Sequence, residues 1–251
     1  MRITFLGTGT STGNPQMLCG CHTCISKNPK DKRLRSSVFI ETNDSSILID
    51  CGPDFRQQAI RADIKAIDAV ILTHEHYDHV GGIDDIRPFC NNEGMPIYSY
   101  ERVLERLKII MPYSFASNPY NGVPVLKLHP VFTHEFMINQ TRVIPIDLLH
   151  YKLPVLGLRI DNLAYLTDFN KISEKEIEKL HGVKLLVVDA LRAKPHISHN
   201  SLSEALQLIE AVKPEQSWLI HMSHDMGMQE NVDPCLPDGV HLSWDGLKIE
   251  I

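Results

Sequence analysis

Short apolar runs, most of them without an intervening polar position, recur along this chain. RITFLG at 2–7, AVILT at 69–73 and LLVVDA at 185–190 are examples. A strand that is buried on both faces needs no polar alternation, so such runs predict strands of sheets that are covered on both sides. The predicted strands lie at residues 2–7, 37–42, 46–50, 69–73, 141–148, 155–160, 163–167, 185–190, 217–221 and 247–251.

Helical periodicity is found between these strands. The predicted helices lie at residues 53–62, 101–110, 173–182 and 201–213. The last begins at Ser201, three residues before Glu204, which is the spacing of a capping box. Strands with helices between them predict a layered α/β sandwich. Segment 112–130, rich in Pro, Asn and Tyr, is expected to be a long loop, and without a boundary signal we expect one domain over residues 1–251.

Composition narrows the classes of protein. The 251 residues carry a formal net charge of −6, which argues against a surface that binds nucleic acid by neutralising phosphates. No apolar run approaches the roughly 20 residues that a membrane-spanning helix needs. The opening MRITFLGTGTSTG is typical of a strand and turn rather than of a signal peptide. We therefore expect a cytoplasmic protein whose six cysteines are metal ligands or core residues, not disulfides.

The stretch LTHEHYDHVGG follows one of the predicted strands and crowds ionisable groups together. His74 and His76 fall on the same side of an extended segment. If the chain then turns into a helix, Asp78 and His79 face the same space from the other flank. Imidazole and carboxylate are standard ligands of zinc, manganese and iron, and burying so many polar groups without a partner is costly. The stretch therefore predicts a metal site.

This pattern, H-x-H-x-D-H after an apolar strand, resembles the signature of the metallo-β-lactamase superfamily. The resemblance implies an αββα sandwich with a dinuclear metal site at one edge. It further implies a His, a bridging Asp and a final His at strand ends, and His150, Asp168 and His221 occupy such positions. Asp50, after the run SILI, matches the acid that orients the ligands in this family.

By this resemblance, two divalent ions, zinc or manganese, are expected at the active site. One would be held by His74, His76 and His150. The other would be held by Asp78, His79 and His221, with Asp168 bridging both. Such a pair lowers the pKa of a bound water and stabilises charge that develops on substrate oxygens.

A second cluster, LCGCHTCIS, places three thiols within six residues. Cys19, Cys21 and Cys24 are typical of three ligands of a zinc site, and the local residue His22 and the distant residue His224 are both candidates for the fourth. The phosphoribosyl cyclic phosphate phosphodiesterase branch of the superfamily carries a structural zinc on C-x-C-x-x-C and on a His three residues after the last catalytic-site His. His224 follows His221 at that spacing, so the resemblance favours His224.

The segment ISHNSLSEAL supplies His199 two residues before Ser201. In the phosphodiesterase branch, and in the related tRNA 3′-processing endonucleases, a His at this place donates a proton to the leaving group. The resemblance thus implies that His199, Asp78 and Asp168 are the catalytic residues. The expected substrate is a small cyclic phosphate or nucleotide.

Other features limit how far this resemblance extends. The endonucleases need an inserted arm to bind tRNA, which this sequence lacks, so no large nucleic acid and no membrane partner is expected. The stretches GGIDDIRPF and RLRSS depart from the phosphonate-pathway enzyme, so its exact substrate does not carry over. The oligomeric state is left open, a homodimer included. Arginines that could bind phosphate are Arg33, Arg35, Arg56, Arg87 and Arg192.

Two alternatives remain at this point. A hydrolase of carbonyl compounds such as a thioester, lactone or β-lactam would use the same metals without needing His199. A metal-bound binding protein could keep the fold without turnover. His129, His134, His181 and His241 match no ligand position, nor do Cys51, Cys90 and Cys235.

Overall fold

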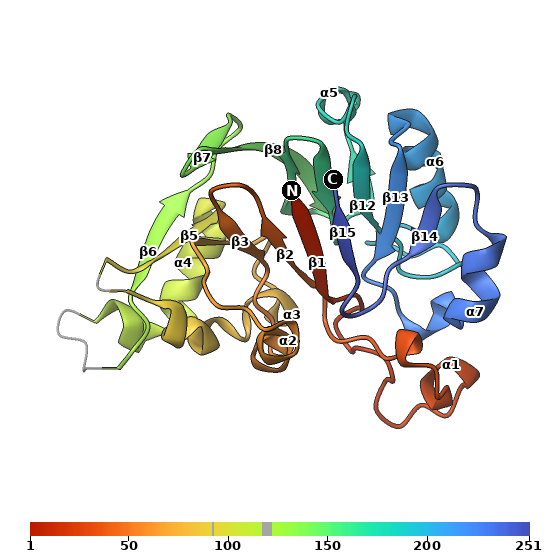
Figure 1. Ribbon diagram of the computed structural model, residues 1–251, viewed down its shortest axis with the longest axis horizontal. Coiled ribbons are helices and arrows are strands. Elements are labelled where there is room, and N and C mark those ends of the chain that lie inside the picture. Colours follow the sequence, from red (N-terminus) through yellow and green to blue (C-terminus); the bar gives the residue numbers. More distant parts are fainter. Residues whose placement is uncertain (92, 117–121) are drawn as a thin grey trace.

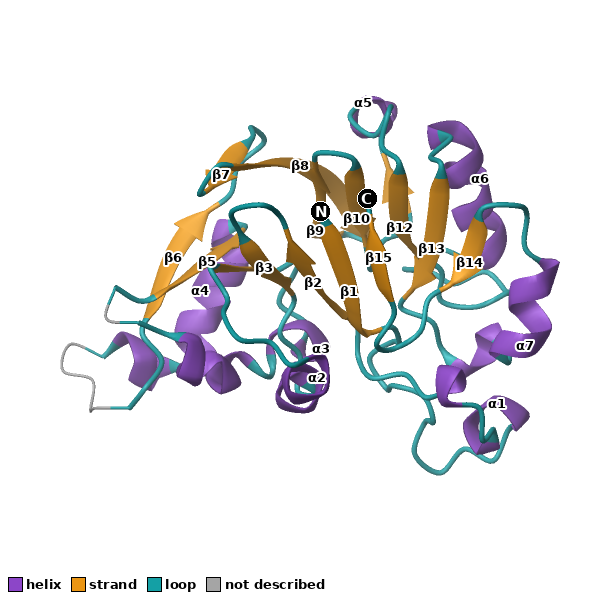
Figure 2. Cartoon of the chain, in the orientation of Figure 1, coloured by secondary structure: helices purple, strands orange, loops and turns teal. Residues whose placement is uncertain are grey.

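The computed structural model describes residues 1–91, 93–116 and 122–251, and over these residues the chain forms two packed β-sheets with helices outside them (Figures 1 and 2). The first sheet has the order β15-β1-β2-β3-β4-β5-β6. Its strands are β1 (Arg2–Gly7), β2 (Ser37–Glu41), β3 (Ser46–Ile49), β4 (Ala69–Ile71), β5 (Met95–Ser99), β6 (Leu126–Pro130) and β15 (Lys248–Glu250).

The second sheet has the order β11-β8-β9-β10-β12-β13-β14, with β7 paired to β8. Its strands are β7 (Phe136–Ile138), β8 (Thr141–His150), β9 (Leu153–Ile160), β10 (Leu163–Leu166), β11 (Lys171–Ile172), β12 (Leu185–Asp189), β13 (Gln216–Ile220) and β14 (Val240–Leu242). The α-helices are α1 (His22–Ile25), α2 (Phe55–Ala62), α3 (Tyr77–Val80), α4 (Glu101–Ile110), α5 (Glu174–Glu178), α6 (Leu202–Val212) and α7 (Gln229–Val232). The 3₁₀ helices are η1 (Pro29–Asp31), η2 (Ile83–Phe89), η3 (Pro112–Phe115), η4 (His224–Met226) and η5 (Asp233–Cys235).

Each sheet buries both of its faces. The inner faces pack together through residues such as Ile3, Ile71 and Tyr165. On the outer face of the first sheet lie α2, α4 and η2, and on the outer face of the second lies α6 (Figure 2). The predicted αββα sandwich is confirmed. Burial on both sides also explains why the strand sequences lack polar alternation.

The strands that lead to the predicted ligands run parallel, so their carboxyl ends meet at one edge of each sheet. In the first sheet β3 and β4 are parallel, and in the second β10, β12 and β13 are parallel. Asp50, Asp168 and His221 each follow such a strand and have a positive φ, of 61°, 50° and 61°. Left-handed backbone is uncommon outside glycine and collects at functional sites. It turns each side chain out of its strand at this edge.

The structure differs from the predicted elements at the rims of the sheets. Segment 112–130 is not one long loop, since it contains η3 and ends in strand β6, while residues 117–121 lie outside the described residues. Strand β5 was not predicted because Pro96 interrupts its apolar pattern. The strands β7, β11 and β14 have only two or three residues each, too few for a recognisable period.

Two further predictions concern the helices and the membrane. The capping box of α6 is confirmed, because the Ser201 hydroxyl accepts from the Glu204 backbone N–H and Glu204 accepts from the Ser201 N–H. Helix α5 ends at Glu178, earlier than predicted. No helix in the described part of the chain is long and apolar enough to span a bilayer. That residues 1–251 form a single domain stays a prediction.

Candidate active site

The H-x-H-x-D-H stretch adopts the turn that its pattern suggested. His74 and His76 lie on extended backbone after β4, and α3 begins directly after His76. Asp78 and His79 are therefore on the first turn of a helix, and both are buried. A Cβ at Gly82 would collide with the carbonyl of Gly52, so glycine permits the close packing of these segments.

One group of potential ligands is compact and buried. The side chains of Asp78, His79, Asp168 and His221 offer atoms that all lie within 4.8 Å of one another. His79 Nε2 is 3.2 Å from a carboxylate oxygen of Asp78 and 3.2 Å from one of Asp168. His221 Nε2 is 3.1 Å from Asp168 Oδ1. These are the residues that the sequence assigned to one metal, together with the bridging acid.

The other predicted group lies beside it. The ring centroids of His74 and His76 are 4.5 Å apart, those of His76 and His150 are 5.2 Å apart, and those of His74 and His150 are 6.0 Å apart. His74 Nε2 is 3.9 Å from Asp168 Oδ1. Asp168 therefore lies close to members of both groups, and its role as a bridging ligand stays a prediction. The structure brings all seven predicted residues of the dinuclear site together.

Asp50 sets the tautomers of two of these histidines. His79 Nδ1 donates to Asp50 Oδ2 at 2.6 Å. The Thr73 hydroxyl donates to Asp50, so it accepts from His74 Nδ1 at 3.0 Å. Both Nδ1 atoms thus carry protons, which leaves both Nε2 lone pairs directed toward Asp168. Asp50 is fully buried and contacts His79 and Thr73 in the way that the orienting role implied by the resemblance requires.

His150 is oriented by the backbone instead. Its Nδ1 donates to the Ser198 carbonyl at 2.9 Å, so Nε2 again holds the lone pair. Among the described residues, the buried Nε2 atoms of His74, His79 and His221 have no hydrogen-bond partner. Buried polar atoms normally find partners, and imidazole nitrogen and carboxylate oxygen together are the donor set of zinc or manganese. The residues present therefore fit a metal pair.

The electrostatics of the group also favour a cation. Burial opposes the charged form of Asp168, yet its pKa lies well below the usual value because His221 and His79 stabilise the carboxylate. Burial likewise opposes a charged His79, but Asp168, Asp78 and Asp50 raise the pKa of His79 well above its ordinary value. By contrast, burial and the charge of His199 lower the pKa of His150 to about 4. The carboxylates thus require positive charge, which a divalent ion can supply in place of the proton.

Asp189, the last residue of β12, belongs to this site although the sequence did not single it out. It is fully buried, and one carboxylate oxygen lies 3.5 Å from His199 Nδ1 while the other lies 3.6 Å from His221 Nδ1. It also accepts from the Asn200 N–H at 3.0 Å. The signal that could have found it is its place after LLVV, since Asp50 and Asp168 likewise follow buried strands.

His199 lies at the side of the cluster. Its ring centroid is 4.5 Å from that of His150 and 4.8 Å from that of His221. Although burial opposes protonation, Asp189 and Asp168 raise the pKa of His199. Ser201, its expected companion, caps α6 through its hydroxyl. The structure thus places a histidine with a raised pKa beside the two groups of ligands.

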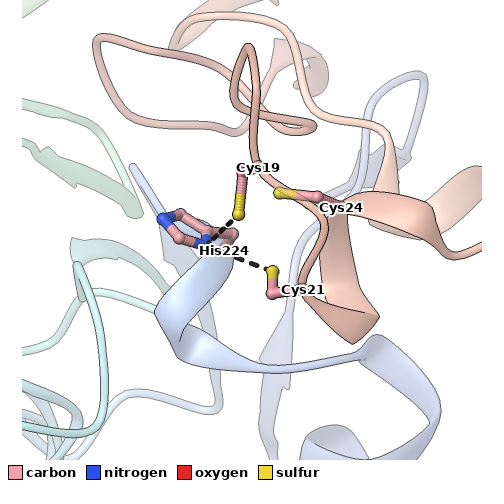
Figure 3. A group of neighbouring side chains, drawn as sticks. All are labelled: Cys19, Cys21, Cys24 and His224. Atoms are coloured by element: carbon pink, nitrogen blue, oxygen red, sulfur yellow. Dashed lines mark hydrogen bonds between the residues drawn. The ribbon is translucent and has the colours of Figure 1, made fainter.

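The cysteine cluster is assembled around His224 (Figure 3). Its Nδ1 lies 3.3 Å from Cys21 Sγ and 3.6 Å from Cys19 Sγ, and with Cys24 the four ligand atoms all lie within 4.8 Å of one another. Three thiols and an imidazole at this spacing fit a closed tetrahedral zinc site. His22, the local alternative, is not in this group.

The predicted phosphate-binding arginines are mostly engaged elsewhere. Arg33 is buried and donates to the Thr8 hydroxyl and to Gln229. Arg35 pairs with Asp54 at 2.9 Å, and Arg87 pairs with Asp84 at 2.6 Å. Arg56 is exposed on α2. Arg192 begins the loop that leads to His199.

The other histidines and thiols that match no ligand position belong to neither group of potential ligands among the described residues. His129 and His134 stack on Tyr98 and Phe132, and His241 packs at a tilt against Trp218. His181 is exposed, Cys51 is buried, Cys90 is partly buried and Cys235 is exposed.

The arrangement of the site agrees with the family and the solved structure that the chain resembles. The family model described as the beta-lactamase superfamily domain matches residues 45–222, which include every predicted residue of the dinuclear site. The chain belongs to the β-lactamase superfamily. A crystal structure of a diphosphatase from the PhnP family superposes with a TM-score of 0.92 at 37% identity, covering 99% of this chain and 97% of the other. The αββα sandwich is thus the metallo-β-lactamase fold, and solved hydrolases share it.

Curated relatives in this superfamily carry different names. An octanoyltransferase of Porphyromonas gingivalis is 42% identical over 251 residues, which is 99% of this chain and 51% of that protein. A ribonuclease Z of Crocosphaera subtropica is 29% identical over 166 residues, which is 64% of this chain and 47% of that protein. The chain therefore spans about half the length of these curated relatives.

Proposed function

We propose that this protein is a dinuclear-metal-dependent phosphodiesterase that hydrolyses a small cyclic phosphate or nucleotide. The observation that carries the proposal is the position of His199. Its Nδ1 lies 3.5 Å from Asp189 and 4.0 Å from Asp168, at the edge of the two groups of ligands. A proton donor at that place serves a reaction whose leaving group is a poor one, as an alkoxide is.

The ligand sets follow from the described geometry. His74, His76 and His150 would hold one ion, Asp78, His79 and His221 the other, and Asp168 both. When bound, zinc or manganese would activate water and neutralise charge on the phosphoryl oxygens.

The chain's own residues would manage the protons. Nδ1 of His199 lies 3.5 Å from Asp189, so Nε2 would be the nitrogen that offers a proton to a substrate. Asp189 would hold the ring in that tautomer and would stabilise its cationic form, while Asp50 and Ser198 hold the ligand histidines in theirs. During hydrolysis, Nε2 of His199 would pass its proton to the leaving oxygen, and water would restore it after the product departs.

The names of similar proteins support hydrolysis of two different kinds of phosphate bond. The ribonuclease Z name supports a phosphodiester substrate, whereas the PhnP-family neighbour is a diphosphatase. A diphosphate is therefore the second candidate substrate. Its leaving group is a phosphate, which is much less basic than an alkoxide, so it needs a general acid less. The octanoyltransferase name belongs to a protein of which this chain matches only 51%, and it assigns no acyl chemistry to this half.

The cysteine cluster would bind a structural zinc. Cys19 and Cys21 lie on the N-terminal loop, Cys24 lies in α1, and η4 supplies His224, three residues after His221. Zinc at this place would connect the loop to the rim of the active site. The free energy of zinc binding would then contribute directly to folding.

An activity panel tests the proposal. Protein loaded with Mn²⁺ or Zn²⁺ would be assayed on 2′,3′-cyclic AMP, bis-p-nitrophenyl phosphate, ADP, a thioester and nitrocefin. Turnover of the cyclic nucleotide supports the phosphodiesterase, and turnover of ADP alone supports the diphosphatase. Activity restricted to the thioester or to nitrocefin would establish a carbonyl hydrolase, and metal binding without any turnover would indicate a binding protein. The cytoplasmic location and the oligomeric state remain proposals of their own, testable by fractionation and light scattering.

A further inference from the structure

A second histidine, His196, stands beside the proposed acid and has no role so far. Its ring centroid is 5.2 Å from that of His199. It is partly buried, and the described groups of potential metal ligands do not include it. It lies on the loop between β12, which ends at Asp189, and α6, which begins at Leu202.

Side chains donate hydrogen bonds to several carbonyls of this loop. Arg192 donates through Nε to the Lys194 carbonyl at 3.2 Å and through Nη2 to the Pro195 carbonyl at 2.9 Å. The Ile197 carbonyl accepts from the Asn170 side chain at 2.8 Å. The Ser198 carbonyl accepts from His150 Nδ1 at 2.9 Å. Hydrogen bonds therefore hold the loop on both sides, and one of the donors, His150, is itself a proposed metal ligand.

A hydrogen bond within this loop indicates which nitrogen of His196 carries a proton. The Ser198 backbone N–H donates to His196 Nδ1 at 3.3 Å. Nδ1 is then the acceptor, and a neutral ring has its proton on Nε2. His196 thus presents an N–H donor from a preorganised loop, next to the histidine that would protonate a leaving group.

We propose that His196 is a specificity-determining residue that donates from Nε2 to an oxygen of the substrate's leaving group. The inference rests on the proposed function, because it takes the side of His199 as the leaving-group side. The class of leaving group that fits is oxygen-rich, such as a ribose that carries a free hydroxyl. A flat aromatic leaving group without sugar hydroxyls would not engage this donor.

The experiment compares two substrates of the metal-loaded enzyme. In 2′,3′-cyclic AMP the leaving oxygen and its neighbours belong to a ribose, whereas thymidine 5′-p-nitrophenyl phosphate loses p-nitrophenolate. His196→Ala should lower kcat/KM on the cyclic nucleotide about 3- to 10-fold, the effect of one hydrogen bond, mainly through KM. The p-nitrophenyl ester should change less than about twofold, since it lacks that bond.

Matched variants distinguish the loss of a substrate contact from a disturbance of the loop. His196→Gln keeps a side-chain N–H donor and should recover part of the lost efficiency. Ile197→Ala, at a 68% exposed position of the same loop, should leave both substrates unaffected. Metal content and Tm are measured for each variant, so that a loss caused by a disturbed loop is recognised.

The outcomes are distinct. A loss confined to the cyclic nucleotide, with partial recovery in His196→Gln, supports the inference. Equal losses on both substrates, or none on either, overturn it while leaving the proposed function intact. If the wild-type enzyme hydrolyses no phosphate ester at all, the proposed function fails and this inference fails with it.

Discussion

Asp50 offers a sharp test of the candidate metal centre, because it touches no metal in the proposed ligand sets yet orients a ligand in each. The substitution Asp50→Asn keeps size and shape but replaces one carboxylate oxygen with NH₂. One oxygen can still accept from the Thr73 N–H, a bond of 2.8 Å. The amide nitrogen then faces His79 Nδ1, which lies 2.6 Å from Asp50 in the native protein.

Two donors cannot share that contact, so the proton of His79 is expected to move to Nε2. There it would donate to Asp78 and Asp168, each 3.2 Å away, in place of a metal. Changes to groups that orient ligands typically cost 10- to 100-fold in metal affinity. At about 1.4 kcal/mol per tenfold, the expected loss is roughly 1.4 to 2.7 kcal/mol of binding free energy.

The assay is competition between the protein and a chelator for Zn²⁺ or Mn²⁺, with Tm of the metal-free protein measured in parallel. Asp245→Asn is the matched control. Asp245 is also a buried carboxylate, and it accepts from Thr8 and from the Leu34 N–H, neither of which is a proposed metal ligand. It should lower Tm without changing metal affinity.

A comparison with the Thr73→Val variant distinguishes the affinities of the two proposed metal sites. That change removes the acceptor of His74 Nδ1 and leaves His79 untouched, so only the ion held by His74, His76 and His150 should weaken. Asp50→Asn should weaken both. Native metal affinity in Asp50→Asn would refute the reasoning about tautomers, as would equal losses in Asp50→Asn and Asp245→Asn.

Three further predictions address the remaining residues. Asp168→Ala removes the carboxylate between the two groups, so activity should fall below detection and metal content should drop while circular dichroism shows a retained fold; full activity would contradict the bridging role. Cys21→Ser should lose one zinc equivalent by elemental analysis and lower Tm, and an unchanged zinc content would exclude the structural site. His199→Ala should slow turnover of 2′,3′-cyclic AMP about 10²- to 10⁴-fold but that of bis-p-nitrophenyl phosphate far less, because p-nitrophenolate leaves without a proton. Equal losses on the two substrates would show that His199 acts by positioning instead.

Local pattern was enough to predict most strands and the histidine cluster. Strands that are buried on both faces appear as unbroken apolar runs. The ligands of the H-x-H-x-D-H stretch lie within six residues, so they can converge without contacts from distant parts of the chain. The resemblance to the superfamily then supplied His150, Asp168 and His221, each at a strand end. Short rim strands such as β11 escaped because a few residues carry no period, and their pairing depends on a neighbouring strand.

The apolar runs therefore predict sheets that are buried on both faces, and the residues that follow the runs predict which side chains stand at the strand ends. Only the folded chain shows which of these strand ends lie next to one another. Asp189 joins His199 to His221 only because β12 and β13 are adjacent and parallel, and its place after the apolar run LLVV does not tell which side chains it will meet. His224 completes a cluster whose other members lie about 200 residues earlier. Such contacts depend on which strands are neighbours and on the left-handed backbone of residues such as Asp168 and His221, and neither leaves a periodic trace in the sequence.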